Sequence, residues 1–136
     1  MADIQRLNPD SVHAPVGGYS HLSRVQAREL LFLAGQVAVD LEGNLVGVGD
    51  IQAQVRQIYA NIGQILESAG TSWANVVQLT TYVVGRDNLD SFLEERTKII
   101  TRLYPEGDLP PSTLLLVDGL YTEEILAEVV AAAAIP

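Results

Sequence analysis

The pattern of apolar and polar residues predicts two amphipathic helices. In the first, apolar residues recur every three or four positions over residues 51–69, with Asp50 before them and Gly70 after them. In the second, the stripe runs from Leu89 to Leu103 and Pro105 follows its end. Each helix therefore has one apolar side that must be buried against another layer.

Segments rich in β-branched and aromatic residues predict strands before, between and after the helices. They cover residues 21–25 and 30–39, which we expect to form a hairpin, a short edge strand at 45–46, and residues 76–84, 112–118 and 126–135. The order β-β-β-α-β-α-β-β predicts an α+β fold in two layers, a mixed sheet with both helices on one face. Residues 1–136 are expected to form a single domain.

The last two strands, which contain LLLV and VVAAAAI, are apolar on both faces. A strand with one solvated face alternates apolar and polar residues, so something must cover the face that the helices leave free. No further element of the chain remains for that role. A second copy of the chain is the simplest cover, and the sequence therefore predicts a homo-oligomer.

Composition narrows the classes of partner. The 136 residues include 8 basic and 17 acidic side chains, a net charge of −9, which disfavours nucleic acid as a partner. The absence of cysteine excludes disulfides and thiolate metal sites. No secretory signal and no membrane-spanning run is recognised, so we expect a cytoplasmic protein without membrane contact.

Arg96 interrupts the apolar stripe of the second helix, where an apolar residue is expected. Its side chain should therefore point toward the protein. Two roles are open: the guanidinium binds a carboxylate in a cleft between subunits, or it forms a salt bridge at an interface with Glu94, Glu95 or an acidic residue of a partner.

Several motifs together resemble the RidA/YjgF family of reactive-intermediate deaminases. They are APVGGYS, LLFLAGQVAVD, QVRQIYANIGQILESAG, VVQLTTYVV and PPST, and the similarity spans about residues 14–135. The resemblance implies a chorismate-mutase-like fold and a homotrimer with ligand clefts at subunit interfaces. It also implies hydrolysis of 2-enamines and 2-imines to 2-oxo acids and ammonia, with no metal or cofactor.

The resemblance also implies a set of cleft residues, and this sequence has only some of them. Pro111 stands where the family has the Arg of a P-A-R-S motif, Val130 where it has a water-orienting Glu, and Arg96 where it has an Asn. The substrate-binding residues carried over are Tyr19, Ser20, Ala34, Gly35, Gln36, Phe92, Arg96, Pro111, Ser112, Glu128 and Val130. Catalytic residues stay unassigned.

Most of these residues also have a purely structural interpretation. Tyr19 either offers a hydroxyl to the cleft or packs at a subunit boundary. Ser112 and Thr113 either donate to a ligand or bond the backbone of their own turn. Glu128 shares a strand face with Val130 and either replaces the missing acid or pairs across an interface.

Two functions follow from this set. The first is a hydrolase of enamines, imines or related unstable carbonyl compounds that departs from the family pattern. The second is a trimer that binds a small metabolite without reacting with it. Ribonuclease activity, attributed to some relatives, is disfavoured by the acidic charge and by the lack of a cluster of His, Lys and Arg.

Overall fold

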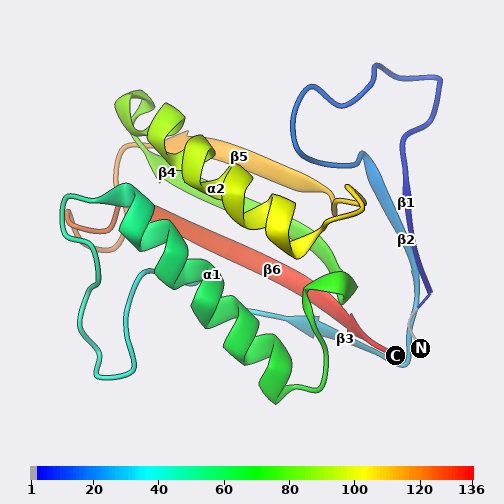
Figure 1. Cartoon of the computed structure of the whole chain (residues 1–136), viewed down its shortest axis with the longest axis horizontal. Helices are drawn as coiled ribbons and strands as arrows, with labels where there is room; N and C mark the ends of the chain where they lie inside the picture. Colours follow the sequence, from blue (N-terminus) through cyan, green and yellow to red (C-terminus); the bar gives the residue numbers. More distant parts are fainter. Residues whose placement is uncertain (1–2) are drawn as a thin grey trace.

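The structure, a computed structural model, describes residues 3–136. Its order is β-β-β-α-β-α-β-β, with an unpredicted first strand at Asp3–Leu7 and no strand at the predicted edge position 45–46. Figure 1 shows two helices lying side by side over one face of a sheet. The elements are β1 (Asp3–Leu7), β2 (Leu22–Gln26), β3 (Glu29–Phe32), α1 (Ile51–Ser68), β4 (Val76–Val84), α2 (Leu89–Leu103), β5 (Ser112–Val117) and β6 (Ala127–Ile135). The α+β fold class is confirmed.

The main sheet has the strand order β3-β6-β4-β5. Strand β6 pairs antiparallel with both β3 and β4, while β4 and β5 are parallel. A parallel pair needs a crossover connection, and α2 supplies it between β4 and β5. No helix within residues 3–136 combines the length and the apolar character needed to cross a membrane.

The core lies between the helices and the near face of the sheet. Alternate residues of β6, among them Ala127, Val129 and Ala131, are buried there, as the period of a strand requires. The helices contribute Val55, Ile58, Ile62, Leu66, Phe92, Ile99 and Ile100. Both apolar stripes therefore pack on the same sheet face, as predicted.

The N-terminal strands pair differently from the expected hairpin. Strand β1, which is too short and polar to be recognised from the sequence, pairs antiparallel with β2. The chain then turns onto β6, and the Arg28 N–H donates to the Ile135 carbonyl at 3.1 Å. Strand β3 therefore pairs with β6, and the predicted edge strand at 45–46 is reduced to a bridge between Val39 and Leu45.

Residues 3–136 leave the sheet face opposite the helices uncovered. Phe32 is 80% exposed on this face, and Leu30 and Leu115 are also exposed. We define the open face by the residues that alternate with the buried ones: Leu30, Phe32, Gln78, Thr80, Tyr82, Thr113, Leu115, Glu128, Val130 and Ala132. Exposed large apolar side chains gathered on one sheet face are typical of an interaction site.

Arg6 joins the β1–β2 pair to the rest of the domain. Its side chain is only 4% exposed, and its guanidinium donates to the carbonyl oxygens of Asp108 at 2.8 Å, Ala74 at 3.0 Å and Val76 at 2.7 Å. It also lies 5.5 Å from the centre of the Tyr104 ring. The Asp108 carboxylate is largely exposed, so the carbonyl bonds carry the contact.

Replacing Arg6 with methionine should lower the free energy of unfolding by about 2–3 kcal/mol, because three carbonyls lose a charged donor while the aliphatic stem is kept. Urea unfolding would measure the change. Arg24→Met, at an exposed position on β2, is the matched control and should change little. Equal effects of the two substitutions would show that the carbonyl contacts of Arg6 contribute nothing.

Candidate functional site

Arg96 projects from α2 toward the sheet, as its place on the apolar stripe predicts. It is 9% exposed, and its Nη2 atom donates to the Gly18 carbonyl at 3.0 Å. The same atom lies 3.4 Å from the Ser112 hydroxyl at the start of β5. A Cβ atom at Gly18 would lie 3.1 Å from the Ile100 side chain, so glycine allows the loop to pass this close.

The charge of Arg96 has no acidic partner within residues 3–136. Glu95 instead lies 3.3 Å from Arg56, and Glu94 lies 3.8 Å from Lys98. A salt bridge from Arg96 to Glu94 or Glu95 of its own chain is therefore excluded as the explanation for its inward position. A buried cation without a counter-charge is costly, and the Gly18 carbonyl and the Ser112 hydroxyl replace only part of the water that it loses.

Tyr59 of α1 adds a second polar group beside Arg96. Its hydroxyl is buried and has no hydrogen-bond partner in the described part of the chain. Burial raises the pKa of Tyr59, and the nearby positive charge of Arg96 partly opposes this rise. The sequence did not predict that Tyr59 lies beside Arg96. Tyr59 follows Ile58 on the buried side of α1, where its sequence position does not distinguish it from a core residue.

The LPPST turn places Ser112 under Arg96. Prolines have no N–H, but the Pro110 carbonyl accepts from the Ser20 N–H at 3.4 Å and the Pro111 carbonyl accepts from the Leu79 N–H at 2.9 Å. The turn is thus fixed to the loop on one side and to β4 on the other. Pro111 contributes a carbonyl to the sheet rather than a side-chain cation.

Tyr19 lies in the loop that covers Arg96, and its hydroxyl accepts from the Val16 N–H at 3.3 Å. Its ring meets His21 edge to face at 5.6 Å, and His21 meets His13 in the same way at 5.0 Å. A ring nitrogen of His21 also lies 2.7 Å from the His13 carbonyl. The aromatic cluster holds the loop in shape, and the Tyr19 hydroxyl keeps its own proton free to donate.

A second group of candidate residues gathers around Glu128. Its side chain lies against Gly35, where a Cβ atom would overlap the carboxylate. The Gln36 N–H donates to the Val129 carbonyl at 2.8 Å, and the Gln36 side chain donates to the Ala34 carbonyl at 3.2 Å. The glycine of the AGQ segment thus makes room for the Glu128 carboxylate, which has no ion pair within the described range.

The two groups lie on opposite sides of the sheet. Ser112 aligns with the buried Leu79, whereas Glu128 aligns with Tyr82 on the open face, and Val130 shares that face. Phe92 belongs to neither group, since it is fully buried in the core. A single chain therefore does not bring Arg96 and Glu128 together.

These features define a class of protein: a two-layer α+β domain with one uncovered sheet face and a buried guanidinium that lies beneath an N-terminal loop and has no acidic partner in residues 3–136. The family model described as Endoribonuclease L-PSP matches residues 10–135. The chain therefore belongs to this family, the RidA/YjgF family.

Individual relatives agree with this assignment. A RutC family protein of Pyrococcus horikoshii is 31% identical over 121 residues, 88% of each chain. The 2-iminobutanoate/2-iminopropanoate deaminase of Mus musculus is 29% identical over 112 residues, 81% of this chain and 78% of that protein. A crystal structure of a Rid family protein of unknown function from Yersinia pestis is 33% identical, covers 97% of this chain and 98% of that one, and superposes with a TM-score of 0.84.

Proposed function

We propose that the protein is a homotrimer that binds small enamines or imines bearing a carboxylate in clefts at its subunit interfaces and hydrolyses them. Arg96 holds the substrate carboxylate. The observation that carries this proposal is the buried Arg96 guanidinium without an acidic partner in residues 3–136. A substrate carboxylate would supply the missing negative charge.

The position of Arg96 supports a substitute for the cation that the resemblance places on β5. The guanidinium reaches the Ser112 hydroxyl, one residue beyond Pro111 in the PPST motif. The guanidinium of Arg96 on α2 therefore lies near the start of β5, where the resemblance places the family's arginine. A long side chain from a neighbouring element makes this exchange possible without moving the backbone.

The open face supports the oligomer. Its apolar residues are exposed in the protomer, and association of like subunits would remove them from water. Arg96 reaches Ser112 at the start of β5, which is an edge strand, so a neighbouring subunit on the open face could bring its Glu128 to Arg96 over that edge. In that arrangement Glu128 of the partner subunit would replace the water-orienting glutamate that the family has at the position of Val130.

The chemistry needs few groups. Water adds to the carbon of the C=N bond, and the resulting carbinolamine then breaks its C–N bond to give a 2-oxo acid and ammonia. An enamine enters this path as its imine tautomer. Arg96 fixes the carboxylate next to that carbon, and the Glu128 carboxylate orients the water, takes its proton and returns it to the nitrogen, which leaves as ammonia when the carbinolamine O–H proton also passes to it. The sequence of the mouse relative, a 2-iminobutanoate/2-iminopropanoate deaminase, supports this substrate class.

The direct test mixes the pure protein with freshly generated 2-aminoacrylate and follows ammonia and pyruvate. We expect release well above the rate of spontaneous hydrolysis. Substitution of Pro111 by arginine places a second cation in the motif and tests whether the cleft lacks one. No release by the wild type, together with release by Pro111→Arg, would contradict the role of Arg96 in catalysis.

That same outcome would support a trimer that binds a metabolite without hydrolysing it. Val130 at the position of the water-orienting acid favours this second function, because an apolar side chain can neither position water nor accept a proton. Retained binding of pyruvate or another 2-oxo acid, measured by calorimetry on a protein without activity, would identify it.

A further inference from the structure

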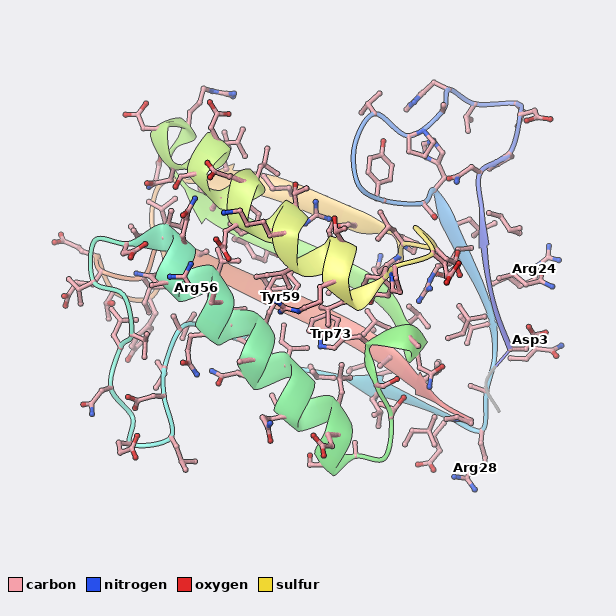
Figure 2. The ribbon with its side chains drawn as sticks, viewed as in Figure 1. Asp3, Arg24, Arg28, Arg56, Tyr59 and Trp73 are labelled. Atoms are coloured by element: carbon pink, nitrogen blue, oxygen red, sulfur yellow. The ribbon has the colours of Figure 1, made fainter. Side chains whose placement is uncertain are left out.

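A groove runs between the two helices on the side of the molecule away from the open face. It has a volume of about 590 Å³ and is lined by α1, α2 and the turn that precedes β4. Its lining includes Tyr59, Gly63, Trp73, Ile99, Arg102 and Leu103. Figure 2 shows Tyr59 and Trp73 together between the helices, with Arg56 at one end.

The floor of the groove is aromatic. The rings of Tyr59 and Trp73 stack with centroids 5.1 Å apart and planes inclined by 14°. Gly63 makes room for the indole, since a Cβ atom there would lie 3.2 Å from the Trp73 Nε1 atom. Trp73 is only half-buried, and the Tyr104 hydroxyl fixes its backbone by donating to the Trp73 carbonyl at 2.7 Å. A fixed, partly exposed indole is a stacking surface for a planar ring.

The groove offers one cation, Arg102, to an anion. Glu95 is neutralised by Arg56 at 3.3 Å and by Lys98 at 3.9 Å. Arg102, in the last turn of α2, has no ion pair with any residue from 3 to 136. Glu67 is the lining acid that opposes an anion, and it is exposed and lies beyond ion-pair distance of Arg102.

We propose that this groove binds a small aromatic carboxylate, with the ring against Trp73 and the carboxylate on Arg102. Stacking on the indole accounts for the aromatic part, and the unpaired guanidinium accounts for the charge. The site is separate from the Arg96 cluster, although Tyr59 contributes to both. It would remain accessible in an oligomer formed through the open face, because the helices lie on the other side of the sheet.

Trp73 is the single tryptophan of the chain, so its fluorescence reports on this groove directly. The probe is 3-phenylpropionate, with the neutral 3-phenylpropanol as its matched control. We expect a saturable change in emission with a dissociation constant below about 1 mM for the carboxylate, and binding of the alcohol weaker by about fivefold or more.

Three substitutions in the groove and one distant control test whether the probe binds there. Arg102→Gln should weaken binding by about fivefold, and Glu67→Gln should strengthen it because the opposing charge is gone. Ala60→Phe, at an exposed position that lines the groove, should prevent binding by filling it. Arg24→Gln, an exposed change on β2 that Figure 2 shows at the far side of the molecule, should have no effect.

The Glu128→Gln protein separates this site from the proposed active site, because Glu128 lies on the other face of the sheet and this variant should bind the probe as the wild type does. Loss of binding in that variant, equal affinity for the acid and the alcohol, or wild-type affinity in Arg102→Gln would each overturn the proposal. So would a fluorescence signal that does not saturate by about 10 mM probe.

Discussion

Replacing Arg96 with methionine is expected to lower kcat/KM for a 2-imino acid by about 100-fold, equivalent to about 2.7 kcal/mol of transition-state stabilisation. The substitution keeps the aliphatic stem that packs under the loop of Gly18 and removes only the charged fork. Arg96→Lys retains the charge without the fork and should lose about tenfold. Release of ammonia and the 2-oxo acid under initial-rate conditions would measure both losses.

The same variant distinguishes a functional role from a structural one. Removing the charge of Arg96 should change the free energy of unfolding by at most about 1 kcal/mol, because the lost bonds to Gly18 and Ser112 are offset by relief of a buried charge without an acidic partner in residues 3–136. Lys98→Met, at an exposed position on the same helix, is the control and should retain full activity. A less stable Arg96→Met protein with normal kcat/KM would show that the guanidinium only supports the loop.

Replacing Phe32 with aspartate is expected to dissociate the proposed trimer into monomers at micromolar concentration. Phe32 is 80% exposed in the protomer, and an interface over the open face would bury it in each of the three subunits. A carboxylate in such an interface would be desolvated without a partner, at a cost of several kcal/mol per subunit. Sedimentation velocity or light scattering on a sizing column would give the mass.

Leu41→Asp is the matched control for this experiment. Leu41 is 99% exposed in the segment between β3 and α1, outside the open face, so the same chemical change there should leave the mass unaltered. If the wild type is itself a monomer, or if Phe32→Asp associates as the wild type does, then the open face is not the interface. Dissociation should also remove activity, because one protomer keeps Arg96 and Glu128 on opposite sides of its sheet.

The sequence predicts those helices and strands whose apolar pattern lies within one segment of the chain. The helix from Leu89 to Leu103 and the strand from Val76 to Val84 have the bounds that their apolar spacing predicts. Strand β1 could not be predicted in this way, because it is held by partners far away in the sequence. Its pairing with β2 and the contacts of Arg6 with residues near 74 and 108 are both non-local.

The candidate site shows the same division. The inward direction of Arg96 followed from the 3.6-residue period of the helix. The period does not give its neighbours, because Gly18 and Ser112 lie 78 and 16 residues away along the chain. Only the family resemblance grouped Ser112 and the Tyr19 loop with Arg96. The sequence also could not show that Arg96 lacks an acidic partner within the described residues. Glu94 and Glu95 lie close to Arg96 in sequence, but in the structure they pair with Lys98 and Arg56.

The sequence by itself determined the two helices, the central strands, the two-layer α+β class and the inward position of Arg96, because each depends on the spacing of residues within one segment. Only the tertiary structure decided which loop covers Arg96, that its charge is unpaired within residues 3–136, and that Glu128 lies on the other side of the sheet. It also decided where Tyr59 and Trp73 stack. The physical reason is that these contacts join distant segments, and their geometry is set by strand register and helix packing.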